Sequence, residues 1–347
     1  MKPDNKPQIV FLYTELAGYM LHCFEALTKA GCDVHVFHLP VNPEAPFQFD
    51  LRVSNCHFYP RADFPGRALD TEIEKIKPQL ILCSGWIDKG YLRVCKNQRD
   101  KALTVLGFDN QMPDNPKSWL SLLFAKWQYK PFFRVVWVPG APQVKYARAL
   151  GFKGNEIFTG VYTTNVSKIQ EAGRQNPLPK RFVFVGRYVD IKGVRELWKA
   201  FDEISMPGWE LWCAGQGELF EQRLQKPGIH HLGFVQREQM DTFVAAGGVF
   251  VLPSHKEPWG MVVHEFAAAG YPLICSESVG AASAFVREGK NGYLMKPGSV
   301  ESLKMAMQKM AAQDEESLSE MGEVSAKLAQ TITVDKWVKT VFDLLKL

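Results

Sequence analysis

Residues 255–272 read HKEPWGMVVHEFAAAGYP, and this stretch is the best guide to the fold of the chain. The apolar run Val249–Leu252 before it is short and β-branched, which is typical of a buried parallel strand. Pro258 disfavours the α conformation for Glu257, so this carboxylate is expected on a loop rather than in a helix. The helical pattern that follows ends at Gly270. The sequence therefore predicts a strand, a loop and a helix in this order.

Two carboxylates mark this segment, Glu257 on the loop and Glu265 inside the helix, whose pattern begins at Trp259 and Gly260. If the whole segment were helical they would lie about 12 Å apart, too far to share one small group or one metal ion. Between them is a helix N-terminus, whose unpaired N–H groups and dipole favour an anion. Acids at both ends and an anion site in the middle match a sugar nucleotide, which has hydroxyls at both ends and a diphosphate between them.

Composition bounds the class of protein. A chain of 347 residues with 46% hydrophobic and 22% charged residues is long enough for two globular domains. The formal net charge of +4 and the absence of a basic run do not indicate a nucleic acid partner. The seven cysteines form no Cys-x-x-Cys pair, so we expect reduced, mostly buried thiols in a cytoplasmic protein rather than a metal site or a disulfide framework.

The sequence also bears on membrane association. The first seven residues are polar, and no apolar run approaches the ~20 residues needed to cross a bilayer. Residues 118–137 combine aromatic and basic side chains, which fits either a core helix followed by a strand or an interfacial surface for a lipid-linked acceptor. We therefore expect a cytoplasmic protein, at most with peripheral contact at the inner face of the membrane.

Buried-type strands alternate with amphipathic helices along the chain, which predicts an α/β protein with doubly wound parallel sheets. The Pro-containing residues 167–180 are interpreted as a linker, and a helix is expected from Arg237 to Ala246. Three parts are predicted: an N-terminal Rossmann-like domain at 1–165, a second such domain at 166–330, and a C-terminal helix at 331–347 that packs back on the first domain.

A family resemblance rests on four features of the second half. They are the Glu-x7-Glu spacing with its Glu-Pro-Trp-Gly opening, the Glu-x-Ala-Ala-x-Gly helix, the Gly-Arg…Lys-Gly motif at 186–193 and the Ala-Gly-x-Gly turn at 214–217. Together they resemble the retaining glycosyltransferases of family 4, the group 1 transferases, which have the GT-B fold. This resemblance implies two Rossmann-like domains that face a cleft, with the acceptor bound by the first and the nucleotide sugar by the second.

The resemblance also implies roles for individual residues. Arg187 and Lys192 would hold the donor diphosphate, and Glu257 would position the sugar hydroxyls. In the loop after residue 107 the family's histidine position holds Phe108, which leaves Asp109 as the polar candidate or as an Asx turn before a proline. The residues expected to bind the donor are Gly18, Val235, Trp259, Gly260, Met261, Val262 and Glu265.

The implied reaction moves a sugar of the hexose type from a nucleoside-diphosphate sugar to an acceptor hydroxyl, in cell-surface glycan or glycoconjugate synthesis. The acceptor would be a glycan, a lipid-linked molecule or a small molecule. No Asp-x-Asp element occurs, so we expect no metal and no cofactor. Two alternatives stay open, a non-catalytic GT-B protein that binds sugar nucleotides and a sugar-nucleotide epimerase. The pair Gly215-x-Gly217 lacks the third glycine of a dinucleotide fingerprint, with Phe220 in its place, so an NAD enzyme is disfavoured.

Overall fold

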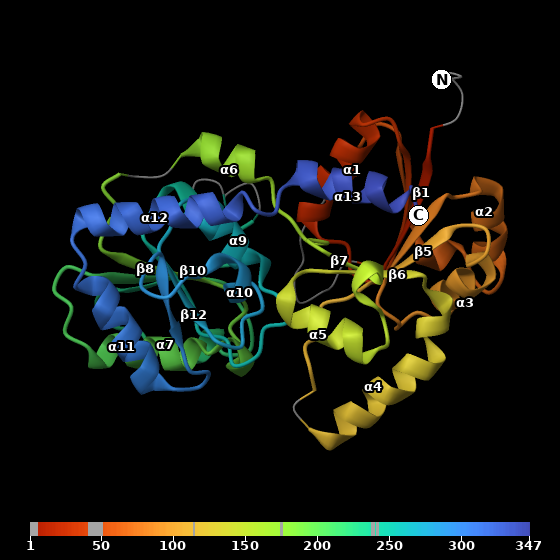
Figure 1. Cartoon of the computed structure of the whole chain (residues 1–347). Coiled ribbons are helices and arrows are strands. Elements are labelled where there is room, and N and C mark those ends of the chain that lie inside the picture. The colour runs from red at the N-terminus through yellow and green to blue at the C-terminus, as the bar shows by residue number, and fades with distance from the viewer. Residues whose placement is uncertain (1–5, 41–50, 114, 174–175, 237–239, 241–242) are drawn as a thin grey trace. The chain divides into compact units, whose positions relative to one another are not determined.

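The computed structural model describes the chain except residues 1–5, 41–50, 114, 174–175, 237–239 and 241–242. The chain forms two compact units, the first from residues 1–164 and 332–347 and the second from residues 165–331 (Figure 1). Each unit is built on its own parallel sheet with helices on its faces. The two doubly wound parallel sheets predicted from the sequence are therefore confirmed.

The sheet of the first unit has seven strands in the order β3-β2-β1-β4-β5-β6-β7. The strand order reverses between β1 and β4, as in a doubly wound sheet. The strands are β1 (Gln8–Tyr13), β2 (Asp33–His38), β3 (Cys56–Pro60), β4 (Leu80–Ser84), β5 (Leu103–Gly107), β6 (Val135–Val138) and β7 (Ile157–Thr159).

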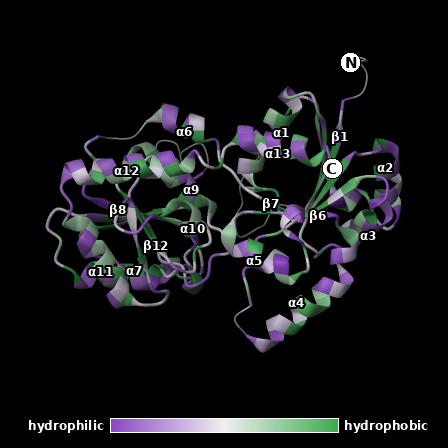
Figure 2. Cartoon of the chain, in the orientation of Figure 1, coloured by the Kyte–Doolittle hydropathy of each residue, from purple (hydrophilic) through white to green (hydrophobic). Residues whose placement is uncertain are grey.

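Both faces of this sheet are covered, because alternate residues of each strand enter two different hydrophobic cores. Leu12 of β1 belongs to one core and Phe11 to the other. The apolar colour of the strands in Figure 2 reflects this double burial, which is typical of parallel sheets. The helices of the unit are α1 (Gly18–Lys29), α2 (Ala68–Ile76), α3 (Lys89–Gln98), α4 (Pro116–Gln128), α5 (Ala141–Ala149) and α13 (Val334–Leu344), with short 3₁₀ turns at Arg61–Asp63, Lys130–Phe132 and Gly154–Glu156.

The C-terminal helix α13 belongs to the first unit and lies beside α1 (Figure 1). Its Trp337 is 1% exposed, and the indole N–H donates a hydrogen bond of 2.9 Å to the carbonyl oxygen of Val161. The same ring packs against Phe11 and Trp137, with centroid distances of 5.9 and 5.2 Å. The last helix thus completes the core of a unit whose other elements lie far earlier in the sequence.

The sheet of the second unit has six strands in the order β10-β9-β8-β11-β12-β13. Its strands are β8 (Arg181–Val185), β9 (Glu210–Ala214), β10 (Ile229–Gly233), β11 (Val249–Leu252), β12 (Leu273–Ser276) and β13 (Gly292–Met295). Its helices are α6 (Val166–Ala172), α7 (Val194–Glu203), α9 (Met261–Ala268), α10 (Ala282–Phe285), α11 (Val300–Ala311) and α12 (Glu315–Ala329), with 3₁₀ turns η4 (Asp190–Lys192) and η5 (Phe220–Gln222).

One expected element differs from the structure, because the first part of the proposed linker at 167–180 is the helix α6. The side chain of Asn165 caps this helix by accepting a hydrogen bond of 3.1 Å from the backbone N–H of Lys168, and α6 packs on α9. The prolines that suggested a linker, Pro177 and Pro179, follow the helix rather than interrupt it. The helix expected from Arg237 to Ala246 lies in part outside the described residues.

Replacement of Trp337 tests how much α13 stabilises the first unit. We expect Trp337→Ala to lower the free energy of unfolding by about 3–5 kcal/mol, because it removes a fully buried indole and a hydrogen bond to Val161. Lys339→Ala on the exposed side of the same helix is the control and should change stability little. Denaturant unfolding followed by circular dichroism measures both. Equal stability of the two variants would contradict the packing role.

Candidate functional site

The carboxyl ends of β8 and β11 are the centre of the candidate site. The strand order of the second sheet reverses between these two neighbours, and ligands of doubly wound sheets bind at such a switch point. The loop after β8 carries Arg187 and Lys192, and the loop after β11 carries Glu257. The fold therefore brings the predicted bases and the first predicted acid to adjacent loops.

Backbone hydrogen bonds fix the loop after β11. The N–H of Gly280 donates to the carbonyl oxygen of Glu257 at 3.1 Å, and the N–H of Ala281 donates to that of Trp259 at 2.8 Å. A β-bridge joins Glu257 to Val279 in the segment after β12. The Trp259 ring is 2% exposed, so it anchors the loop in the core rather than facing solvent. Glu257 is consequently held on a rigid loop, outside any helix, as its sequence context predicts.

Helix α9 starts at Met261, two residues later than the start expected at Trp259. The cause is Gly260, whose φ of +92° and ψ of 70° are left-handed and cannot continue into a right-handed helix. A Cβ on Gly260 would lie 3.0 Å from Cγ of Glu257, so the glycine also leaves space for that side chain. No side chain caps the N-terminus of α9, which leaves its first turn at Met261 and Val262 suited to an anion.

Lys192 and Glu257 form an ion pair across the two loops. Their side chains are 19% and 12% exposed, so the pair is largely screened from bulk water. Lys192 ends the 3₁₀ turn η4, which precedes α7. From the sequence, these residues are expected to bind different parts of one ligand. Their direct contact is not predictable from the sequence, because they lie far apart in the chain.

Close backbone packing holds the two loops in register. The backbone N–H of His255 donates a hydrogen bond of 2.8 Å to the carbonyl oxygen of Ile191. A Cβ on Gly193, which has φ of +67°, would lie 2.3 Å from the carbonyl oxygen of Pro253. Only glycine fits this contact, and it is the residue directly after Lys192.

Three further predicted site residues of the second unit are Arg187, Glu265 and Val235. Arg187 is exposed in the loop after β8, and Glu265 is partly buried in the second turn of α9. Val235 follows β10, which is separated from β8 by β9, and it is partly buried. The second unit thus holds nine of the predicted site residues, which are Arg187, Lys192, Val235, Glu257, Trp259, Gly260, Met261, Val262 and Glu265.

The Gly215-x-Gly217 turn has a structural role that its sequence pattern did not reveal. A Cβ on Gly215 would lie 1.8 Å from the carbonyl oxygen of Gly186, and one on Gly217 would lie 2.5 Å from that of Tyr188. The backbone N–H of Tyr188 donates a hydrogen bond of 2.8 Å to the carbonyl oxygen of Gln216. The backbone at these glycines therefore packs directly on the backbone of the loop that carries Arg187.

The remaining predicted residues, Gly18 and Asp109, belong to the first unit. Gly18 is the first residue of α1 and directly follows the loop after β1. Asp109 follows β5, and its carbonyl oxygen accepts a hydrogen bond of 3.1 Å from the side-chain amide of Gln143. Burial raises the pKa of the Tyr162 phenol well above its usual value, and the nearby Asp109 carboxylate adds to this rise. Asp109 therefore lies near the phenol of Tyr162 and is held through its backbone by the side-chain amide of Gln143.

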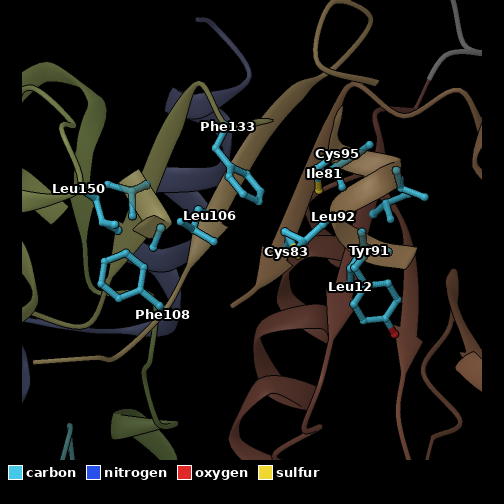
Figure 3. Close-up of a cluster of buried hydrophobic side chains, with 14 of the residues drawn as sticks. Leu12, Ile81, Cys83, Tyr91, Leu92, Cys95, Leu106, Phe108, Phe133 and Leu150 are labelled. Carbon is cyan, nitrogen blue, oxygen red and sulfur yellow. The ribbon is translucent and has the colours of Figure 1, made fainter. Parts of the chain in front are cut away.

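Phe108, at the family's histidine position, is a core residue. It is 4% exposed and packs against Tyr146 and Trp86, with centroid distances of 5.3 and 5.7 Å. Figure 3 shows its ring among the buried side chains near Leu150. A side chain at this position contributes to packing rather than to a polar site.

Of the two histidines beside the acidic pair, His264 has a packing role. It is fully buried, its ring stacks on Phe285 at a centroid distance of 4.4 Å, and its Nε2 donates a hydrogen bond of 3.1 Å to the carbonyl oxygen of Ala329 in α12. His255 lies with its Nε2 3.1 Å from a carboxylate oxygen of Glu196 in α7. This contact adds a further link between the loop after β11 and the helix that follows Lys192.

In the described part of the chain, no group of three or more His, Cys, Asp or Glu side chains is arranged to hold a metal ion. None of the described helices combines the length and the apolar character needed to cross a bilayer.

Comparison with known proteins gives a family match for the second unit. Residues 166–327 match the family model of the glycosyl transferases group 1. The lipopolysaccharide core biosynthesis glycosyltransferase LpsE of Rhizobium meliloti is 31% identical over 167 residues, which cover 45% of this chain and 46% of the relative. The chain thus spans about half the length of this curated relative. These matches bear out a group 1 glycosyltransferase domain in the part of the chain that carries the Lys192–Glu257 pair.

Solved structures match the whole chain. The sucrose-phosphate synthase of Thermosynechococcus elongatus superposes with a TM-score of 0.76 at 18% identity and covers 98% of both chains. Anabaena HepE in complex with UDP and glucose superposes with a TM-score of 0.71 at 18% identity, covering 98% of this chain and 99% of that one. The chain therefore has the GT-B fold of two Rossmann-like domains, as the sequence predicts.

The close approach at Gly215 can be tested by stability. We expect Gly215→Ala to lower the free energy of unfolding by about 3 kcal/mol or more, because the new methyl group meets the carbonyl oxygen of Gly186. The matched control is Gly289→Ala in the same unit, where φ is +71° but no atom lies within 4 Å of the new Cβ. That variant should lose only about 1–2 kcal/mol from backbone strain. Equal losses in denaturant unfolding would refute the contact.

Proposed function

We propose that the chain is a retaining, metal-independent glycosyltransferase of family 4, which transfers a hexose from a nucleoside-diphosphate sugar to an acceptor hydroxyl. The observation that carries this proposal is the Lys192–Glu257 pair at the switch point, directly beside the uncapped N-terminus of α9. The group 1 match over residues 166–327 supports the reaction class. The UDP and glucose bound to HepE make UDP-glucose a suitable first donor to test.

Charge on the leaving diphosphate is the main quantity that the site must stabilise. Lys192 and Arg187 supply positive charge, and the backbone N–H groups from Gly260 to Val262 supply oriented donors at the helix N-terminus. Both kinds of group lie on loops whose backbones are fixed, so little reorganisation is needed as charge develops. We infer that this electrostatic stabilisation provides most of the rate enhancement.

The ion pair also suggests how the site adapts to a donor. Without a ligand, Glu257 and Lys192 neutralise each other in a poorly solvated position. When a diphosphate enters, its oxygens take over as partners of Lys192, and Glu257 is released to accept hydrogen bonds from sugar hydroxyls. Glu265, one turn further along α9, then accepts from the ribose hydroxyls, while the backbone near Val235 contacts the base.

The acceptor side of the proposal rests on the first unit. Gly18, at the start of α1, would allow the backbone to approach the diphosphate, and Asp109 would face the reacting sugar or the acceptor. We propose an acceptor that is a glycan, a lipid-linked molecule or a small molecule, in the synthesis of cell-surface glycans or glycoconjugates. No cofactor is needed for this reaction, and the absence of an Asp-x-Asp element in the sequence supports metal independence.

A second function, donor binding without turnover, is favoured by one observation. Phe108 occupies the histidine position and is packed into the core, so no imidazole assists the reaction there. Release of nucleoside diphosphate separates the two functions, because a binding module shows affinity for the donor without cleaving it. Purified protein incubated with UDP-glucose and related donors should release the diphosphate if the chain is a transferase.

Lys192→Ala tests the leaving-group role. We expect turnover to fall roughly 10²–10³-fold, because a positive charge is lost where negative charge develops. Lys199→Ala on the exposed face of α7 is the matched control and should leave turnover unchanged. Donor cleavage is measured by diphosphate release, with circular dichroism to confirm folding. Full activity of the Lys192→Ala variant would refute the assignment.

Glu265→Ala tests donor recognition. We expect the Kd of the donor to rise about 10–100-fold, because hydrogen bonds from the ribose to a charged acceptor are lost. The affinity for a donor analogue that lacks both ribose hydroxyls should be nearly the same in the variant and the wild type. Glu301→Ala, an exposed acid at the start of α11, is the control. Isothermal titration calorimetry measures these affinities, and an unchanged Kd in the Glu265→Ala variant would exclude the ribose contact.

A further inference from the structure

Helix α4 carries an exposed apolar face that the proposed reaction does not use. Its five members have exposed fractions from 44% to 82%, and they are Trp119, Leu120, Leu123, Phe124 and Trp127. No other stretch of similar length among the described residues exposes so many large apolar side chains. Two tryptophans and a phenylalanine in water carry a large cost in free energy unless a partner covers them.

The geometry of the helix places these five residues on one side. At 100° per residue they fall within an arc of roughly 140°. The buried residues of α4, Leu122 and Ala125, lie on the opposite side, where the helix packs against α5 and the 3₁₀ turn Lys130–Phe132. In Figure 2 the green segments of α4 alternate with purple and white ones, as expected for a helix with two different sides. The apolar face therefore points away from the core of the unit that carries it.

The segment that carries this face has charged residues of one sign only. Residues 115–153 contain seven Lys and Arg and no Asp or Glu, although the whole chain has a formal net charge of only +4. Lys117 and Lys126 lie on α4 itself, each roughly 90° from the centre of the apolar face, one on either side. Lys145 and Arg148 are exposed on α5, which packs against α4. An apolar face with one lysine on each flank matches the boundary between acyl chains and anionic headgroups.

We propose that α4 is a membrane-docking helix that lies in the plane of a bilayer containing anionic lipids. Its aromatic and leucine side chains enter the acyl boundary, while Lys117 and Lys126 contact the headgroup phosphates. Its 13 residues span only about 20 Å, which suits a helix on the surface rather than across the bilayer. This inference does not depend on the proposed transfer reaction.

A second copy of the chain is the less favourable occupant. Pairing α4 with α4 would cover the apolar residues, but it would also bring the lysines of one copy towards those of the other. Like charges at such a contact are repulsive, whereas an anionic membrane attracts them. Charge complementarity therefore selects the membrane.

Vesicle co-sedimentation of the full chain tests the proposal. We expect binding to phosphatidylcholine vesicles that contain phosphatidylglycerol, weaker binding to phosphatidylcholine alone, and loss of the difference at high salt. Tryptophan emission should shift to shorter wavelength on binding, because two indoles leave water. No binding of the wild type to the anionic vesicles at low salt would overturn the proposal.

Two sets of variants separate the apolar and the basic contributions. Leu120→Glu combined with Trp127→Glu changes side chains that are 70% and 82% exposed, so folding should be retained, and vesicle binding should fall at least about tenfold. Lys117→Gln with Lys126→Gln should weaken binding to anionic vesicles by about fivefold per base and leave binding to neutral vesicles unchanged. Met305→Glu, at a residue 51% exposed on α11, is the control and should bind as the wild type does.

The two sets of variants distinguish a docking helix from the other possible roles of this face. Reduced binding of both sets, with donor cleavage in solution unchanged, supports the docking helix and is independent of the transfer reaction. If both sets bind as the wild type does, α4 is not the docking surface. If the wild type instead forms a dimer in sedimentation that Leu120→Glu with Trp127→Glu abolishes, and does not bind vesicles, the face belongs to a second copy and the proposal is wrong.

Discussion

Direct contact between the backbone of the loop after β8 and those of its two neighbouring loops is the constraint on which the site depends. Gly193 meets the carbonyl oxygen of Pro253, and Gly215 meets that of Gly186, at distances that admit no side chain. These contacts lock the loop after β8 between the loops after β9 and β11. The charged residues of the site are carried on these loops, whose backbones are therefore fixed, and a fixed backbone limits the reorganisation that a bound ligand requires.

Within this frame, opposite charges lie in one poorly solvated place. Lys192 and Glu257 pair with each other, Gly260 leaves room for the carboxylate, and the first turn of α9 has no cap. An ion pair of this kind adds little to stability, because loss of hydration offsets the attraction between the charges. In the proposed function a ligand would replace both partners, with phosphate for the lysine and hydroxyls for the carboxylate.

The first unit differs from the second in its exposed features. Its core is completed by Trp337 of the last helix, and Asp109 stands beside the buried phenol of Tyr162. Its most unusual feature is α4, where the exposed side is apolar and the flanks are basic. Donor binding and membrane docking, as proposed, would then reside in different units. Substitutions that affect one of them would leave the other unchanged.

Local sequence determined the alternation of strands and helices, the two sheets and the position of Glu257 on a loop, because hydrophobic periodicity and Pro258 act on neighbouring residues. It also indicated the group 1 domain through short motifs. Tertiary structure decided where α9 begins, that residues 166–172 are helical, that Lys192 contacts Glu257, and which side of α4 faces water. These depend on residues distant in the chain, or on a backbone angle such as that of Gly260, which packing selects and a linear pattern does not encode.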